Sequence, residues 1–288
     1  MQTRMVVVFM LVSVVAGCAT AGPSAAPRPE APAATRMVYT APASTVLLYD
    51  VQDSTTSQIQ AGPAGTVTVE LGSSGLAEVR IEPDSAGEQV TVGYREFSGS
   101  TSNSASGAVV KVTEADVKAP AVLRVDTTGG VQIVKPPQLT EQFVQVAGSE
   151  SAFRRFFVRV PAGPVRPGAV WVDTVTSRET AEGITTTTTS VITATYAGDT
   201  TVAAQRMNHV TYTATRTVNA SGTTQGVEMR QKLNGTATGY FIWDPARNAV
   251  YEREETVTMN GGFDLPALGM EGLPISAHGR VRLQLRSN

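Results

Sequence analysis

The chain has 288 residues, of which 41% are hydrophobic and 17% are charged, and its formal net charge is −2. This length suffices for one large domain or two small ones, and the balanced charge provides no basic excess for binding nucleic acid. One Cys and two His exclude an intramolecular disulfide and a cysteine-based zinc or iron–sulfur site, so we expect no cofactor and no metal.

Residues 1–17 have the pattern of a secretion signal. Arg4 precedes a run of apolar and small residues that extends from Val6 to Gly17. An apolar helix needs about 20 residues to span a bilayer, and this run is shorter. The pattern therefore predicts a cleaved signal peptide rather than a retained transmembrane anchor.

The single cysteine of the chain stands directly after this signal, in Val15-Ala16-Gly17-Cys18. The tetrapeptide resembles the lipobox of bacterial lipoprotein precursors. The resemblance implies that Cys18 is acylated, with palmitate or a similar chain, and becomes the first residue of the mature protein. Several acyl chains would anchor it stably to a membrane. Ala19 rather than Asp follows the cysteine, which in this class favours the outer membrane, with the folded part facing the periplasm.

Residues 18–43 are dominated by Ala and Pro and contain few side chains large enough to bury. Such a composition is typical of an extended linker. We expect it to hold the folded part of the chain away from the membrane.

Residues 44–135 form a first β region. Apolar and polar residues alternate, Thr and Val are frequent, and clusters of Gly, Ser or Pro interrupt the pattern. We interpret the cluster 72–75 as a break between strands and the stretch 98–107 as a flexible hairpin loop. The expected strands are Thr45–Val51, Thr66–Leu71, Leu76–Glu82, Gln89–Phe97, Ala108–Val112, Val122–Asp126 and Val131–Val134.

Residues 136–168 form a crossover in which the hydrophobic period changes. The spacing of a helical face, with a break near residue 148, is followed by Leu139, Phe143, Val146, Phe153, Phe156 and Phe157, so we expect one or two short helices between residues 138 and 157. A proline-punctuated segment then leads toward Trp171.

Residues 169–288 form a second β region. The residues Tyr251, Val257 and Met259 share one face of an expected strand, whereas Glu252 and Glu254 share the other. We interpret the charged run from Glu252 to Glu255, with Arg253 inside it, as a solvated strand face. The expected strands are Ala169–Ser177, Ile184–Tyr196, Gln205–Val218, Gly226–Leu233, Ala237–Trp243, Ala249–Met259 and Ala277–Leu285.

The two β regions carry a weak internal similarity. The first contains a strand that ends at Asp126 before a tight turn, and the second contains one that ends at Asp244. Because Asp side chains accept hydrogen bonds from the backbone of such turns, turn chemistry explains the similarity best. A duplicated architecture remains the alternative.

The crossover carries a second resemblance. Phe156, Pro161, Pro164-Val165, Pro167-Gly168 and Trp171, followed by Thr-rich strands and the Asp244 turn, are similar to an uncharacterised family of secreted bacterial envelope lipoproteins. Ala169 stands where that family usually has an acidic or polar residue. The resemblance implies a β protein of the cell envelope and brings no catalytic residues with it.

No common catalytic motif is present in the sequence. Gly-x-Ser-x-Gly, Ser-x-x-Lys and the phosphate-binding glycine motifs are all absent. His209 and His278 lie in expected strands nearly seventy residues apart, where a structural or surface role is the simpler reading. We therefore expect a protein that is not an enzyme.

These patterns predict a mainly β fold of antiparallel sheets, with two half-barrel or clamshell-like β regions joined by a short helical crossover. The predicted function is that of a membrane-anchored envelope lipoprotein that binds a hydrophobic small molecule, with Phe156 and Trp171 as candidate ligand contacts. The alternative is a structural or assembly protein of the outer membrane, in which the same aromatics fill a core and protein partners bind the surface.

Overall fold

The computed structural model describes residues 33–41, 43–62, 65–84, 87–181, 183–224 and 226–286. The expected signal peptide, Cys18 and the first part of the expected linker lie outside these residues. The chain divides into Met1–Pro32 and Ala33–Asn288, and the fold below is that of the second unit. In its described residues, no helix is both long enough and apolar enough to cross a bilayer.

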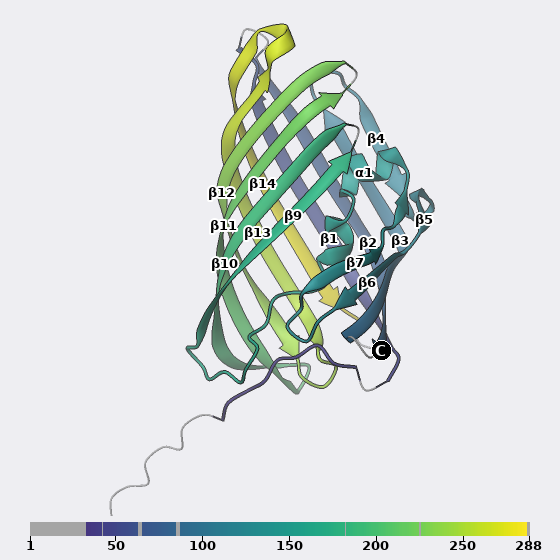
Figure 1. Cartoon of the computed structure of the whole chain (residues 1–288), viewed down its shortest axis with the longest axis vertical. Coiled ribbons are helices and arrows are strands. Elements are labelled where there is room, and N and C mark those ends of the chain that lie inside the picture. Colours follow the sequence, from purple (N-terminus) through teal and green to yellow (C-terminus); the bar gives the residue numbers. More distant parts are fainter. Residues whose placement is uncertain are drawn as a thin grey trace, which may run out of the picture. The chain divides into compact units, whose positions relative to one another are not determined.

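Within the described residues, twelve strands form one antiparallel sheet in the order β7-β6-β3-β2-β1-β14-β13-β12-β11-β10-β9, with β4 paired to β3 (Figure 1). A separate small ladder joins β5 to β8. The strands are β1 (Thr45–Gln60), β2 (Thr66–Asp84), β3 (Gly87–Asn103), β4 (Val109–Thr113), β5 (Val117–Ala119), β6 (Ala121–Val125), β7 (Val131–Lys135), β8 (Gln138–Leu139), β9 (Val170–Ala181), β10 (Ile184–Val202), β11 (Gln205–Thr224), β12 (Val227–Asp244), β13 (Ala249–Leu265) and β14 (Met270–Leu285).

The predicted fold class is confirmed, because the chain is mainly antiparallel β with a short helical crossover between two β regions. The two regions are halves of one continuous sheet, since β1 of the first pairs with β14 of the second from Tyr49–Leu285 to Ile59–Ile275. The sheet does not close on itself. In the described residues, its end strands β7 and β9 are not paired with each other.

In the first half, the expected break at 72–75 is wrong, and the expected hairpin loop at 98–107 is confirmed only for residues 104–107, between β3 and β4. Residues 72–75 lie inside β2, and residues 98–103 lie inside β3, where Gly72 pairs with Ser100 and Ser73 with Gly99. The ladder continues because its hydrogen bonds come from the backbone, and strands on both sides hold these small residues extended. Turn-forming composition is therefore overridden by the neighbouring strands.

The crossover contains the predicted short helices, α1 (Glu141–Ala147) and α2 (Ser151–Arg154). Thr140 caps α1, because its side-chain oxygen accepts a hydrogen bond from the backbone N–H of Phe143 at 3.3 Å. The inward faces of the helices are fully buried, with Phe143, Val146 and Phe153 at 0% exposure. These helices supply the core of the first half of the sheet.

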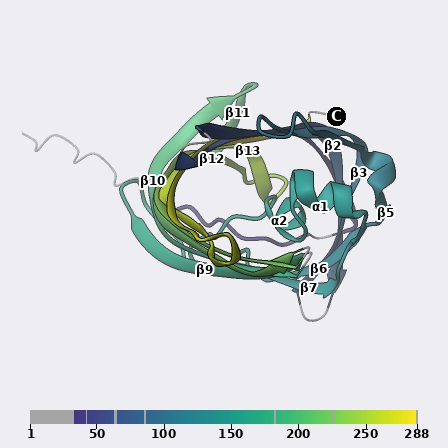
Figure 2. The same ribbon diagram turned by 90° about the horizontal axis from the view of Figure 1, so that it is seen from above.

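The sheet curves around these helices, and Figure 2 shows α1 and α2 inside the curve of the strands. α1 packs against β2, β3 and β4, which all belong to the first half. The concave face of the second half, formed by β9 to β13, has no such helical cover in the described residues. The fold therefore leaves room beside the crossover on that side.

The last part of the expected linker packs against the sheet instead. Thr35 pairs with Val165 in an isolated bridge, and Met37 and Tyr39 are 1% and 4% exposed. The Tyr39 hydroxyl accepts a hydrogen bond from the backbone N–H of Val158 at 2.9 Å. A few apolar side chains in an otherwise Ala- and Pro-rich stretch suffice to anchor it, so the expected linker boundary at residue 43 is too late.

Candidate functional site

A cavity of about 590 Å³ lies on the concave face of the second half of the sheet. Its wall combines inward-facing residues of β9 to β13 with the segment that follows α2. The wall mixes polar and charged side chains with a similar number of apolar ones. Prominent among the apolar side chains are Phe157, Trp171, Ile192, Phe241, Val257 and Met259.

The two aromatic residues singled out from the sequence lie in different places. Trp171 on β9 is half-buried and lines the cavity, and its indole Nε1–H donates to the backbone oxygen of Arg159 at 3.4 Å. Phe156 is 2% exposed and packs in the core against Tyr49, with ring centroids 5.4 Å apart. Its neighbour Phe157 lines the cavity instead.

A charged cluster lies on the same wall. Glu255 on β13 accepts hydrogen bonds from the Tyr212 hydroxyl at 3.0 Å and from Arg253 Nη2 at 2.9 Å, both on Oε2, and from Arg216 Nη2 at 3.0 Å on Oε1. Gly239 on β12 lies between Tyr212 and Glu255 in the ladder. A Cβ there would approach the Tyr212 hydroxyl to 2.7 Å, so the glycine leaves the space that the tyrosine crosses.

The arginines control the ionisation of this carboxylate. Burial alone would raise the pKa of Glu255, which is 5% exposed, but the charges of Arg253 and Arg216 lower the pKa to about 2. Burial also raises the pKa of the Tyr212 hydroxyl to about 12. At neutral pH the cluster therefore holds a carboxylate, two guanidinium groups and a protonated phenol.

A second ion pair adjoins the cluster. Arg155 Nη1 lies 3.2 Å from Asp53 Oδ2, and both side chains are largely buried. The backbone oxygen of Arg155 accepts a hydrogen bond from Arg253 Nη1 at 3.1 Å, which connects the crossover to β13. The pair is neutral in sum, so it adds no net charge to the cavity.

A groove of about 490 Å³ between the end strands β7 and β9 adjoins the cavity. Arg154, Phe157, Arg159 and Val175 line both. Arg159 crosses this groove, with Nε 2.8 Å from Asp173 Oδ2 on β9 and Nη1 3.7 Å from Asp126 Oδ2 in the β6–β7 turn. Arg159 thus joins β9 to the β6–β7 turn beside the cavity.

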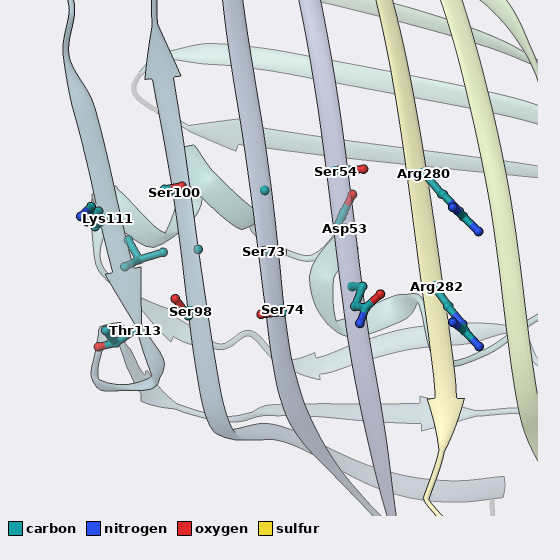
Figure 3. Close-up of a pocket in the computed structure, with 14 residues that line it drawn as sticks. Asp53, Ser54, Ser73, Ser74, Ser98, Ser100, Lys111, Thr113, Arg280 and Arg282 are labelled. Carbon is teal, nitrogen blue, oxygen red and sulfur yellow. The ribbon is translucent and has the colours of Figure 1, made fainter.

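The outer face of the sheet has a larger hollow, of about 760 Å³, over β1 to β4 and β14 (Figure 3). It exists because the side chains at 72–74 and 98–100 are small. Figure 3 shows Lys111 at one margin and Arg280 and Arg282 at the other. The serines are largely exposed, and Arg280 already pairs with Glu254 at 2.8 Å. This hollow therefore has fewer apolar side chains than the concave cavity.

The two histidines and the two turn aspartates noted from the sequence lie outside the cavity. The ring of His209 packs edge-on against Tyr240, and His278 is an exposed residue of β14. In the described part of the chain, no three His, Cys, Asp or Glu side chains gather as a metal site would require. Asp126 and Asp244 accept backbone hydrogen bonds in their turns, as turn chemistry predicts.

The sequence interpretation missed the charged cluster. The sequence predicts a solvated face for Arg253 and Glu255, but they point inward, whereas Glu252 and Glu254 contact arginines of the outer face. Strand alternation carries the signal that could have found them, since Arg253 and Glu255 fall in phase with Tyr251 and Val257. The prediction of a solvated face follows the charge of these residues and not their position in the alternating pattern of the strand.

No protein-family model matches this chain, and no curated protein matches it.

Proposed function

We propose that this chain is a lipid-anchored lipoprotein of the bacterial envelope that binds an apolar or amphiphilic molecule on the concave face of its sheet and catalyses no reaction. The cavity beside the crossover is the observation that carries the binding proposal. Its volume of about 590 Å³ lies within the range of small-molecule sites, about 300–1,000 Å³. Small-molecule sites also combine apolar surface with polar groups that orient the ligand, and this wall offers both.

The groove between β7 and β9 supports a binding function because a ligand could reach the cavity along it. A long molecule could enter between the sheet ends and lie along the wall without the sheet having to unpair. The half-buried Trp171 and the apolar Phe157 would be its first aromatic contacts.

Binding can be measured on the full chain, anchored in lipid nanodiscs, by quenching of tryptophan fluorescence. A brominated long-chain alcohol quenches indole at short range. We expect it to quench Trp171, which lines the cavity, and to spare Trp243, which is 0% exposed. The variant Trp171→Phe retains only Trp243 and is the matched control. Equal quenching of both proteins, or none in either, would contradict the proposal.

The lipid anchor rests on the lipobox of Val15-Ala16-Gly17-Cys18. A hydroxyl does not replace the thiol as acyl acceptor, so Cys18→Ser should abolish both incorporation of labelled palmitate and membrane fractionation. Labelling that persists in this variant would end the lipoprotein proposal and leave the binding proposal to its own test.

Binding of an envelope protein is the second candidate function. Val170 and Val172 on the end strand β9 are 59% and 63% exposed, and Val191 on the adjacent β10 is 40% exposed. Unpaired strand edges with exposed apolar residues favour association with another chain. Val172→Lys should weaken such a contact, detected by crosslinking in the native envelope, and leave quenching of Trp171 unchanged. Crosslinks that persist would contradict this candidate.

A further inference from the structure

The charges of the cluster around Glu255 do not balance. Arg216 and Arg253 share a single carboxylate, that of Glu255, and the neighbouring pair of Arg155 and Asp53 is neutral. The cluster therefore carries one positive charge in excess. Buried charges are costly unless they are paired, so an excess charge on a partly apolar wall favours an anion from outside the chain.

The remaining charged groups of the wall do not supply that anion. Asp173 contacts Arg159 at the groove. Glu179 accepts hydrogen bonds from the Ser149 hydroxyl at 2.6 Å and from the backbone N–H of Ser151 at 3.0 Å, at the edge formed by β9. Both carboxylates thus have contacts of their own away from Arg216 and Arg253.

Arg216 has donor capacity to spare. Its Nε donates to the Ser190 hydroxyl at 3.1 Å and its Nη2 to Glu255, whereas no partner for Nη1 is found among the described residues. Arg253, in contrast, donates from all three nitrogens, to Tyr212, Arg155 and Glu255. The side chain of Arg216 is 23% exposed and lines the cavity, so its free edge is accessible from there.

We infer that the ligand of the cavity is an anionic amphiphile, whose carboxylate or phosphate binds Arg216 and whose alkyl chain lies along the apolar side chains of the wall toward Trp171. This inference rests on the proposed binding function and names its ligand class. The free Nη1 of Arg216 can donate a charge-assisted hydrogen bond to a carboxylate or phosphate, which is stronger than a bond to a neutral acceptor. Ser190 and Glu255 hold the guanidinium in place for it.

The experiment compares dibromostearate with dibromostearyl alcohol on the full chain in nanodiscs, by quenching of Trp171. Partition of each compound into the lipid is measured in protein-free nanodiscs and subtracted. We expect the acid to bind about tenfold more tightly than the alcohol, as one charge-assisted contact at a partly buried site would give. A dibromoalkyl phosphate should bind like the acid if charge and geometry are what Arg216 recognises.

Variants assign the preference to Arg216. Arg216→Gln should remove most of the preference for the acid over the alcohol, and Arg216→Lys should restore part of it. Arg280→Gln, an exposed arginine of the outer face, is the matched control and should leave the preference intact. Because each variant is judged by the ratio of acid to alcohol, differences in partition cancel.

The outcomes separate this inference from the proposed function. If neither compound quenches Trp171, the binding function itself fails. If both quench it equally in the native protein, a result that needs no variant to fold, the cavity binds apolar molecules but the anionic ligand class is overturned. An acid preference that survives Arg216→Gln in a folded protein would also overturn the assignment.

Discussion

At the scale of single residues, the concave face shows how a β-strand can place charge inside a protein. On β13, Tyr251, Arg253, Glu255 and Val257 alternate inward, and the two charged members are satisfied by partners from β11 and the crossover. Removing one member of such a cluster is more damaging than its small net contribution suggests, because the other charges stay buried.

Glu255→Gln should therefore destabilise the protein by about 3 kcal/mol at neutral pH, since it leaves Arg216 and Arg253 without a carboxylate. The pKa of Glu255 is lowered in the folded state from 4.5 to about 2, so its stabilisation is complete above about pH 4.5 and is lost as the pH falls toward 2. The difference in unfolding free energy between the native protein and Glu255→Gln should shrink over that interval.

Denaturant unfolding of the full chain across this pH range measures that difference. Glu254→Gln is the matched control, because Glu254 pairs on the outer face with Arg280, whose side chain is 58% exposed. Exposed pairs contribute about 0–1 kcal/mol, so this variant should change stability little. Equal effects of the two substitutions would show that the inward cluster is not energetically coupled.

At the scale of elements, the strands are longer than their composition suggests. Residues 72–75 and 98–103 continue β2 and β3 through a stretch of Gly and Ser, and this stretch allows α1 to approach the sheet. A Cβ at Gly99 would lie 2.8 Å from Val146 Cγ1 of α1, whereas a Cβ at Gly72 would have no atom within 4 Å. The two glycines therefore serve different purposes in paired strands.

Gly99→Ala should destabilise the protein by about 1–3 kcal/mol, because the added methyl group pushes α1 away from the sheet. Gly72→Ala should be neutral or stabilising by up to about 1 kcal/mol, since it only restricts the unfolded chain. Thermal unfolding of both variants makes the comparison. A Gly99→Ala protein as stable as Gly72→Ala would mean that α1 is not closely packed on β3.

The sequence predicted the elements where periodicity was clean and failed where composition competed with context. Alternation identified most strands and the apolar residues on the inner face of β13, and apolar spacing located the helices before residue 157. The sequence predicts two strands, Gly226–Leu233 and Ala237–Trp243, separated at Asn234-Gly235. The structure has the single strand β12 there, because β11 and β13 pair with both of its edges. Pairing partners are not visible in a local window of sequence.

The candidate site was less predictable than the fold. Trp171 could be proposed as a ligand contact from its place beside the crossover. The choice between Phe156 and Phe157 depends on the backbone direction after α2, which places Phe156 in the core and Phe157 at the cavity. The charged cluster draws residues from β10, β11 and β13, and its contacts arise only when these strands are in register. The local sequence shows which residue types are present, but it does not show which of them come into contact in the folded protein.

At the scale of the whole unit Ala33–Asn288, the N-terminal segment links the two halves of the sheet. The backbone oxygen of Thr40 accepts a hydrogen bond from Asn248 in the β12–β13 turn, and the Ala41 N–H donates to Glu88 on β3. Tyr39 packs edge-on against Trp243, with ring centroids 4.8 Å apart. A segment that resembles a linker in composition thus joins strands from opposite halves.

Two deletions in the full chain separate the linker from this contact. Removal of residues 19–40 should lower the melting temperature by about ten degrees or more, because burial of Met37 alone contributes about 1.5–3 kcal/mol and the Tyr39 contacts are lost as well. Removal of residues 19–32 takes away only Ala- and Pro-rich sequence and should leave the melting temperature nearly unchanged. Both variants keep Cys18, so anchoring is equal. If the longer deletion melts like the shorter one, the segment from Thr35 to Ala41 does not hold the two halves of the sheet together.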